Sequence, residues 1–214
     1  MRVVPPEPDP APPLAAIVLA GGRASRLGGA DKPGLVVGGR TLLATAVGAA
    51  TGAGAGHVVV VGPARTGLAS GARATGSSCR VVFVREHPPG TGPVAALRRG
   101  LAGIGAPVVA VLAADMPFLR SRHLVALLQA MKPAQRGAIL LDDTGAAQWL
   151  AGCWQASALR GQLAGYAGDS LRGLLDPLRP TRLSYPLAAG EPPPWLDCDT
   201  ASDLSRAREW VSRQ

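Results

Sequence analysis

Two positively charged side chains lie in a glycine-rich stretch near the beginning of the sequence. The stretch from Leu19 to Pro33 reads LAGGRASRLGGADKP and follows a short apolar run. Paired glycines let backbone amides approach an anion closely, and Arg26 and Lys32 add positive charge. Lys32 is one of only two lysines in the chain, so general composition does not explain its place here. The stretch predicts a loop that wraps a polyphosphate; the alternative is an ordinary glycine-rich turn with exposed cations.

Two common nucleotide-binding patterns do not occur in this stretch. A dinucleotide fingerprint needs G-x-G-x-x-G, and the phosphate loop of nucleoside triphosphatases needs G-x-x-x-x-G-K followed by Ser or Thr. The stretch contains neither pattern. A different class of nucleotide-binding loop is therefore indicated.

Three aspartates lie where they would offer oxygen ligands. Asp115 follows the apolar run Val108–Ala113, so it supplies a hard oxygen, of the kind that Mg²⁺ prefers, at the end of an expected strand. Asp197 and Asp199 come shortly before the last expected helix and are candidates for a second metal contact or for contacts with an acceptor. The alternatives are a turn or N-cap role for Asp115, and a solvated turn for the other two aspartates, with Thr200 merely capping the helix.

The elements that must position these residues alternate along the first two thirds of the chain. Short apolar runs predict strands that are covered on both faces, and the segments between them have helical spacing. This alternation predicts an α/β three-layer domain with a mostly parallel sheet, whose ligand site lies beyond the carboxyl ends of the strands. The expected strands are Ala15–Ala20, Val58–Val61, Val81–Val84 and Val108–Ala113, and the expected helices are Leu42–Ala50, Val94–Ala102 and Ser121–Met131, the last with Ser121 as its N-cap.

The second half of the chain is less regular. Expected strands are Ala138–Leu141, Trp149–Trp154 and Thr181–Tyr185, followed by a proline-rich loop over Pro186–Pro194. The chain then ends in a helix, for which Thr200 and Asp203 form an approximate capping pattern.

Composition restricts the class of protein. A chain of 214 residues is long enough for one domain, which we expect over 14–214 after a flexible proline-rich tail over 1–13. Three widely spaced cysteines form neither a disulfide framework nor a zinc pattern, so we expect a cytoplasmic protein. No apolar run approaches the length of a membrane span, which argues against membrane insertion.

The net charge of +8 does not by itself indicate nucleic-acid binding. The basic residues are scattered and nearly all arginine, and only two tyrosines and two phenylalanines are available for base stacking. We expect no nucleic-acid partner and, as a milder effect of the charge, attraction of phosphorylated ligands. A homo-oligomer is compatible with the sequence, but no periodicity demands one.

Several stretches together resemble one family. The pattern L-A-G-G-x-x-x-R-[LM]-G-x-x-D-K within Leu19–Lys32 resembles the signature of the molybdenum cofactor guanylyltransferases. Gly90–Ala96, Ala113–Phe118 and Asp197–Leu204 resemble further segments of that family, in the same order. The resemblance runs from about residue 14 to residue 208 and implies a Rossmann-like nucleotidyltransferase domain.

The resemblance also implies roles for individual residues. Catalytic roles fall on Arg26 and Lys32, which would neutralise the triphosphate, and on Asp115, which would bind Mg²⁺. The family's acidic nucleotide contact falls on Glu86 or His87, because the register is uncertain by one residue. Nucleotide binding as a whole is implied for Leu19, Ala20, Gly21, Gly22, Arg26, Lys32, Glu86, Gly92, Pro93 and Asp115.

The sequence departs from the family pattern where the base would be recognised. Val61 stands where the guanylyltransferases often have asparagine, and Ala201-Ser202 replaces the usual Pro-Glu before the last helix. These changes leave the phosphate and metal apparatus in place but leave the base open.

The resemblance implies transfer of GMP from GTP to molybdenum-bound molybdopterin with Mg²⁺, giving the guanine dinucleotide form of the cofactor and pyrophosphate. The alternatives are a cytidylyltransferase that uses CTP and the same pterin, a sugar-phosphate type of nucleotidyltransferase, and a nucleotide-binding regulatory domain without turnover. Site contents rather than fold must decide among them.

Overall fold

The computed structural model describes residues 13–21, 31–65, 79–132 and 134–213. Its centre is a seven-stranded sheet in the order β5-β4-β1-β6-β8-β7-β9. The strand β1 pairs in parallel with both β4 and β6, whereas β8 runs antiparallel to both of its neighbours. The mostly parallel sheet is therefore confirmed. The strands are β1 Leu14–Leu19, β4 Ala55–Val61, β5 Arg80–Val84, β6 Val108–Ala113, β7 Gly137–Leu141, β8 Ala147–Gln155 and β9 Thr181–Ser184.

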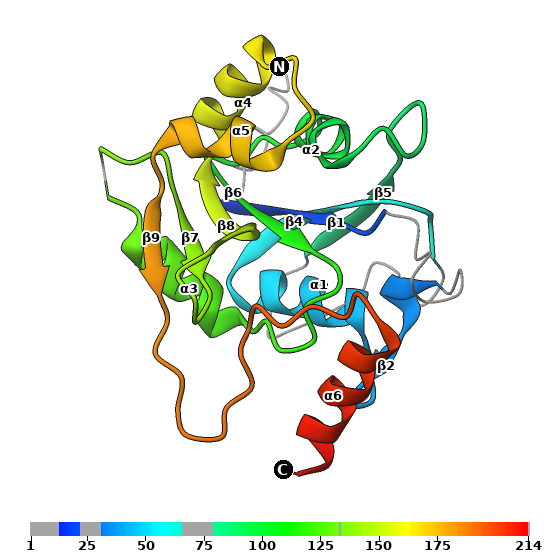
Figure 1. Cartoon of the computed structure of the whole chain (residues 1–214). Helices are drawn as coiled ribbons and strands as arrows, with labels where there is room; N and C mark the ends of the chain where they lie inside the picture. Colours follow the sequence, from blue (N-terminus) through cyan, green and yellow to red (C-terminus); the bar gives the residue numbers. More distant parts are fainter. Residues whose placement is uncertain (1–12, 22–30, 66–78, 133, 214) are drawn as a thin grey trace, which may run out of the picture.

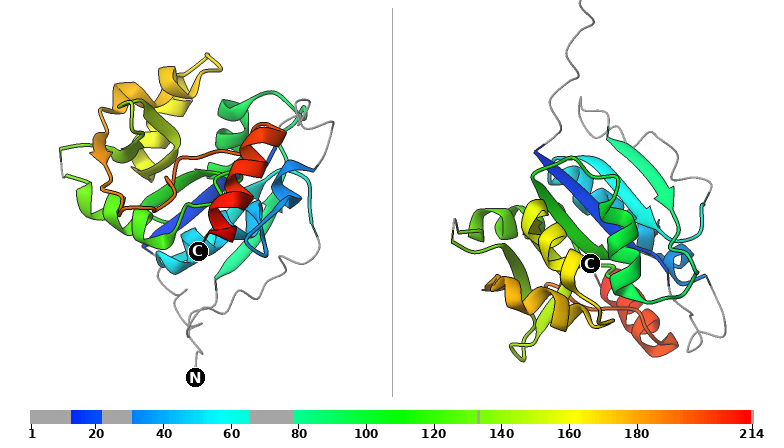
Figure 2. Two further views of the ribbon diagram at one scale, coloured as in Figure 1. Left: turned by 60° about the horizontal axis from the view of Figure 1, so that its bottom comes forward. Right: turned by 90° about the horizontal axis from the view of Figure 1, so that it is seen from above.

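Helices cover both faces of the sheet and complete three layers. Figure 1 shows α1 and α3 below the sheet and α2, α4 and α5 above it, and the right view of Figure 2 shows α2 and α4 lying across the strands. The helices are α1 Leu42–Gly52, α2 Pro93–Leu101, α3 Ser121–Ala130, α4 Ala156–Gly165, α5 Leu171–Leu175 and α6 Ala201–Ser212. Short elements complete the chain: the 3-10 helices η2 Lys32–Gly34 and η3 Asp176–Leu178, and the strands β2 Val36–Val37 and β3 Arg40–Thr41, which pair as a small hairpin.

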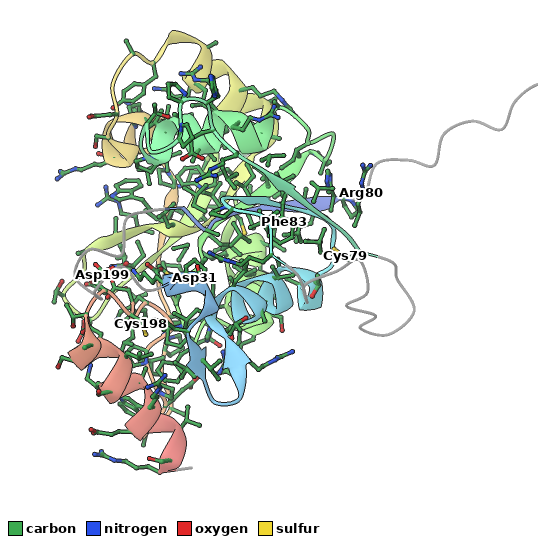
Figure 3. All side chains as sticks on the ribbon, turned by 90° about the vertical axis from the view of Figure 1, so that its right-hand side faces the viewer. Asp31, Cys79, Arg80, Phe83, Cys198 and Asp199 are labelled. Carbon is green, nitrogen blue, oxygen red and sulfur yellow. The ribbon has the colours of Figure 1, made fainter. Side chains whose placement is uncertain are left out.

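The C-terminal arm, which we define as residues 196–212, packs away from the main sheet. Its helix α6 lies beside the β2–β3 hairpin (Figure 2), and Arg208 Nε donates a hydrogen bond of 3.2 Å to the carbonyl oxygen of Val36. Figure 3 shows Asp199 of the arm and Asp31, next to η2, on the same side of the molecule. A small apolar cluster joins the arm to the β2–β3 hairpin and to the start of α1. This small cluster consists of Val37, Leu42, Phe118, Leu196, Cys198, Leu204 and Ala207.

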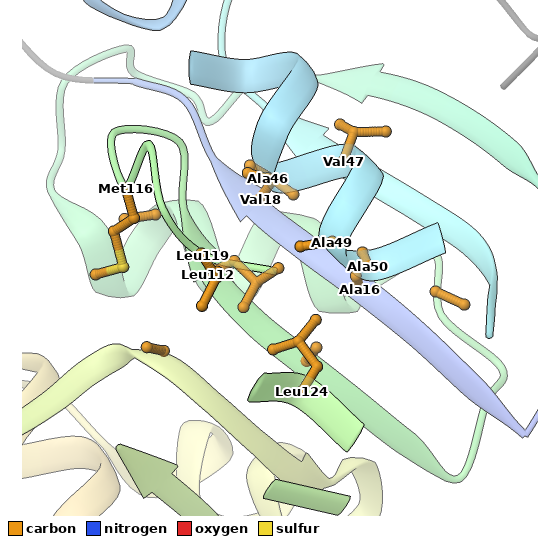
Figure 4. Packing of buried hydrophobic residues seen from close by; sticks show 14 of the residues in the cluster. Ala16, Val18, Ala46, Val47, Ala49, Ala50, Leu112, Met116, Leu119 and Leu124 are labelled. Atoms are coloured by element: carbon orange, nitrogen blue, oxygen red, sulfur yellow. The ribbon is translucent and has the colours of Figure 1, made fainter. Parts of the chain in front are cut away.

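The alternation of side chains along β1 explains why an unbroken apolar run forms this strand. Every residue of β1 is buried. Ala16 and Val18 pack with α1 and α3 (Figure 4), whereas Ala15 and Ile17 pack with α2 and α4 on the opposite face. A strand that contacts helices on both sides has no face for polar residues, so the apolar run is the expected pattern.

Most expected elements are present, with ends shifted by a few residues. One expectation was wrong: Ser121 is the first helical residue of α3, and Arg120 is its N-cap. The amide of Arg120 donates a 3.0 Å hydrogen bond to Nδ1 of His123, so the side chain of the third helical residue satisfies the N-cap amide. The expected proline-rich tail lies almost wholly outside the described residues. Among the residues that are described, no helix is long and apolar enough to cross a membrane.

Candidate active site

Four strand ends are fixed in register at one edge of the sheet. The amide of Ala20, just after β1, donates to the carbonyl oxygen of Val61 at 2.9 Å. The amide of Gly62, just after β4, donates to the carbonyl oxygen of Val84 at 2.9 Å. On the other side of β1, the amide of Ala114 donates to the carbonyl oxygen of Leu19 at 3.1 Å. Residues that follow β1, β4, β5 and β6 therefore lie together at the edge where ligands of α/β sheets bind.

An open cleft of about 1030 Å³ lies at this edge. Eight of the ten residues proposed for nucleotide binding line it, and the other two, Gly22 and Arg26, lie outside the described residues. Asp197 and Asp199 are not part of the lining. The proposed residues that line the cleft are Leu19, Ala20, Gly21, Lys32, Glu86, Gly92, Pro93 and Asp115.

Lys32 joins the two ends of the chain at the cleft. Its Nζ donates a 2.5 Å hydrogen bond to Oδ2 of Asp115 and a second hydrogen bond to Oδ1 of Asp199. Burial alone would lower the pKa of Lys32, but the charges and hydrogen bonds of the two carboxylates outweigh it and raise that pKa. Lys32 is therefore a permanent cation at neutral pH. The Asp115 side chain is 24% exposed and that of Asp199 is 48% exposed, so Asp115 is the inner partner.

The backbone of the C-terminal arm carries Asp199 to this place. The amide of Cys198 donates to the carbonyl oxygen of Asp115 at 3.2 Å, so the arm is attached directly to the second residue after β6. Burial, together with the negative charges of Asp199 and Asp115, raises the pKa of Asp197. Two carboxylates therefore contact a single ammonium group, and the third, Asp197, is close enough to be influenced by their charges.

This carboxylate cluster fits a divalent cation only in part. Among the described residues, no group of three or more His, Cys, Asp or Glu side chains is arranged to hold a metal ion. Asp115 and Asp199 nevertheless converge on one position, which is now held by the Lys32 ammonium. Mg²⁺ in nucleotide sites is usually bound by one or two carboxylates plus substrate phosphates and waters. Two converging carboxylates are thus the donor set that such an ion requires from a protein.

Glu86, and not His87, lines the cleft beside the start of the glycine-rich stretch. Oε1 of Glu86 accepts a 3.0 Å hydrogen bond from the amide of Gly90. A side-chain carbon placed on Gly21 would lie 3.8 Å from the same oxygen, so the carboxylate adjoins the beginning of the glycine-rich loop. His87 is exposed and does not line the cleft. Of the two residues that the register left open, Glu86 is therefore the one that lines the cleft, and its contact with a nucleotide stays a prediction.

The helix α2 begins at the cleft. Gly92 is its N-cap with a φ of +96°, a backbone conformation that favours glycine, and Pro93 follows at the first helical position. Both residues and Ala96 line the cleft. The N-terminal end of a helix has unpaired amides and a partial positive charge, so this end of α2 suits an anionic ligand.

Several residues that line the cleft were not proposed from the sequence as site residues, among them Asp31, Arg65, Arg85 and Leu150. Arg65 and Arg85 follow the ends of β4 and β5, and this position after a strand is the signal that could have identified them. Leu150 belongs to the antiparallel strand β8, whose place next to β6 requires pairing that local sequence does not specify.

Comparisons with known proteins agree with this fold. The MobA-like NTP transferase domain family matches residues 16–183 of the chain. A molybdenum cofactor guanylyltransferase from Xanthomonas euvesicatoria pv. vesicatoria is 32% identical over 203 residues, which cover 91% of this chain and 94% of the relative.

Among solved structures, a nucleotidyl transferase from Methanothermobacter has a TM-score of 0.71 and 25% identity, covering 94% of this chain and 98% of its own. A Mycobacterium tuberculosis protein solved in complex with manganese has a TM-score of 0.64 and 22% identity, covering 92% of this chain and 98% of its own. At that identity the second likeness concerns the fold alone.

Proposed function

The chain belongs to the MobA-like NTP transferase family and is a nucleotidyltransferase of that type, and we propose that it transfers GMP from GTP to molybdenum-bound molybdopterin. The products are the guanine dinucleotide form of the cofactor and pyrophosphate. The relative from Xanthomonas, which is named for this reaction, supports the proposed substrates because the match spans nearly the whole length of both chains.

One observation carries the proposal: a lysine held between two carboxylates at the mouth of a cleft that nucleotide-loop residues line. Lys32 contacts Asp115 and Asp199, while Leu19 and Gly21 lie on the same cleft. Nucleotidyl transfer needs a cation and oxygen ligands within reach of one triphosphate. A site that only bound a neutral small molecule would not need this concentration of opposite charges.

The reaction is an in-line displacement at the α-phosphorus. An oxygen of the acceptor phosphate forms a bond to the α-phosphorus. The bond between the α-phosphorus and the oxygen that bridges it to the β-phosphorus breaks, and pyrophosphate leaves with that electron pair. A phosphate monoester is already anionic and needs no strong general base. Positioning and charge stabilisation therefore supply most of the acceleration.

The chain's own residues would bind and orient the triphosphate. The Lys32 ammonium turns from the carboxylates toward the phosphate oxygens, the backbone of Leu19 and Gly21 holds the nucleotide, and the N-terminal end of α2 faces the same cleft. On sequence alone, we propose that Arg26 also contacts the phosphates.

Asp115 and Asp199 are the residues that would hold Mg²⁺, with Asp197 close enough to add negative charge. When bound, the ion would neutralise phosphate charge and act as a Lewis acid. The manganese complex of a protein with this fold is in line with divalent-cation binding.

Pyrophosphate release by the purified protein tests the proposal. Molybdenum-bound molybdopterin and Mg²⁺ are supplied with GTP or CTP in separate reactions, and Asp115→Asn is compared with the matched control Glu209→Gln, a change of an exposed carboxylate on α6. The expected result is release with GTP that Asp115→Asn lowers by roughly 100-fold or more and Glu209→Gln retains. Release with CTP alone would instead identify a cytidylyltransferase, and nucleotide binding without release under either condition would identify a regulatory domain.

A further inference from the structure

The chain leaving β4 offers no polar side chain to the cleft until Arg65. Val61 is fully buried among apolar side chains. At Gly62 a side-chain carbon would lie 2.8 Å from the carbonyl oxygen of Ala20, so this position accepts glycine alone. Pro63 and Ala64 have no side-chain donor or acceptor. A base bound beside β4 must therefore be recognised by a group other than a side chain at the strand end.

Arg65 is the next residue, and it lines the cleft. Its side chain is only 16% exposed, and its Nη2 donates to Oδ1 of Asp31, the neighbour of Lys32. Its Nη1 is buried and has no hydrogen-bond partner among the residues that the structure describes. A buried donor without a partner costs free energy, so this guanidinium is incompletely satisfied.

Glu86, which lines the same cleft, has a buried acceptor that no donor among the described residues satisfies. Oε1 of Glu86 accepts from the amide of Gly90, but Oε2 is buried without a partner among the described residues. The cleft is thus lined by one residue with an unmet donor and one with an unmet acceptor. Both atoms are shielded from solvent, so contact with a ligand requires rotation of the guanidinium or of the broad terminal torsion of the glutamate.

Building on the proposed function, the geometry points to Arg65 as the residue that selects guanine, acting together with Glu86. Guanine has two neighbouring acceptors, O6 and N7, which a guanidinium binds in bidentate fashion. Its N1–H and 2-amino groups are neighbouring donors, which fit the two oxygens of a carboxylate. Cytosine has a single exocyclic amine for the carboxylate and no counterpart of the O6 and N7 pair.

The ion pair with Asp31 explains how the arginine is held for this task. Asp31 engages one nitrogen of the guanidinium and leaves Nη1 for the base. Asp31 also precedes Lys32 directly, so the residue that would select the base is tied to the segment that would hold the phosphates. A phosphate contact by Arg65 would be indifferent to the base, and this difference can be measured.

Binding of nucleotide analogues tests the inference without turnover. Dissociation constants are measured by calorimetry for GTP, for 7-deaza-GTP, which lacks N7, for ITP, which lacks the 2-amino group, and for CTP. The proteins are the wild type, Arg65→Lys, Arg65→Ala, Glu86→Gln and the control Arg85→Ala, an arginine that lines the same cleft. The Arg65→Lys variant keeps the charge but loses the bidentate fork.

The expected pattern separates base contacts from phosphate contacts. Wild type should bind GTP roughly 10-fold or more tightly than 7-deaza-GTP, and this preference should vanish in Arg65→Ala, diminish in Arg65→Lys and persist in Arg85→Ala. The preference for GTP over ITP should vanish in Glu86→Gln alone. Equal weakening of all four nucleotides in Arg65→Ala would assign Arg65 to the phosphates or to structure and overturn the inference. If the wild type bound no nucleotide, the proposed function itself would fail.

Discussion

The two sides of the cleft are held in different ways. The floor consists of residues that follow β1, β4 and β6, and backbone hydrogen bonds between buried strands fix them in register. The rim consists of Lys32, the β2–β3 hairpin and the C-terminal arm, which are joined by the small apolar cluster and by ion pairs. The floor belongs to the main core, whereas the rim is an attachment to it.

This difference indicates that the floor and the rim have different roles. Asp115 is on the floor, where the end of β6 determines its position. Asp199 is on the rim and reaches Lys32 through the arm, which packs on the hairpin and bonds to the carbonyl oxygen of Asp115 through the Cys198 amide. We infer that the floor supplies preorganised charge and that the rim supplies contacts that depend on the arm.

Replacing the carboxylates of Asp115 and Asp199 by amides tests this difference between floor and rim most directly. Asp115→Asn should lower kcat/KM for pyrophosphate release by roughly 100- to 1000-fold, because it removes preorganised charge at the reacting phosphates. Asp199→Asn should lower it by about 10-fold, because the more exposed rim carboxylate is the less constrained partner. Thermal unfolding of each variant provides the check on folding. Equal losses of activity in the two variants would contradict the distinction between floor and rim.

The floor and the rim also differ in how far the sequence predicted them. The run Val108–Ala113 defined β6 to the residue, because a strand buried on both faces must be apolar throughout. The helices α4 and α5 were not predicted; α4 contains two glycines and its apolar residues are mostly alanine, and α5 is only five residues long. Nothing local pairs Lys32 with Asp199, which are 167 residues apart in the chain. Their contact depends on tertiary packing of the arm, as does the ion pair of Arg65 with Asp31.

Mild acid should destabilise the body of the molecule before it affects the rim. Burial, reinforced by Arg122, lowers the pKa of His123 from 6.5 to about 4, with Glu191 opposing. The folded state therefore favours neutral His123, and stability that is present above pH 6.5 is lost as the pH falls toward 4. The loss is about 3 kcal/mol.

The acid sensitivity of His123 can be measured by unfolding in urea at pH 7.0 and 4.5. His123→Gln keeps an acceptor at the third helical position but does not titrate, so its stability should fall less than that of the wild type over this interval. His57→Gln is the control for a second histidine with a lowered pKa. A wild type and a His123→Gln variant with the same pH dependence would show that His123 is not the cause.

Truncation of Leu204 should loosen the rim while leaving the floor in place. Leu204 is a buried member of the small cluster, so Leu204→Ala should lower the free energy of unfolding by about 2 kcal/mol, the low end for a leucine in a cluster that can collapse. Hydrogen exchange should accelerate in residues 196–212 and remain slow in β1 and β6. The exposed Val211 on the same helix provides the control Val211→Ala. Uniform acceleration across the sheet would mean that arm and body unfold as one unit.

Removing the N-cap of α6 should have the smallest and most local effect on stability. The Thr200 hydroxyl accepts from the amide of Asp203 at 3.2 Å, and Oδ2 of Asp203 accepts from the Thr200 amide and hydroxyl at 2.9 and 2.7 Å. Thr200→Ala removes both side-chain contacts of the hydroxyl and should cost about 1 kcal/mol. Ser202→Ala, in the first turn of the same helix, is the matched control and should be nearly neutral.

The cap also predicts the direction of the pH dependence of the arm. Hydrogen bonds from Thr200 are the largest cause that lowers the pKa of Asp203 below its usual value. A carboxylate with a lowered pKa stabilises the folded state above the pKa of the unfolded chain, and this stabilisation is lost as the pH falls through the folded pKa. Hydrogen exchange of α6 should therefore accelerate below about pH 4, where His123 has already titrated. Because Thr200 directly follows Asp199, loss of the cap should also weaken the rim contact with Lys32. An unchanged KM for GTP in Thr200→Ala would show that the arm holds Asp199 without help from its helix.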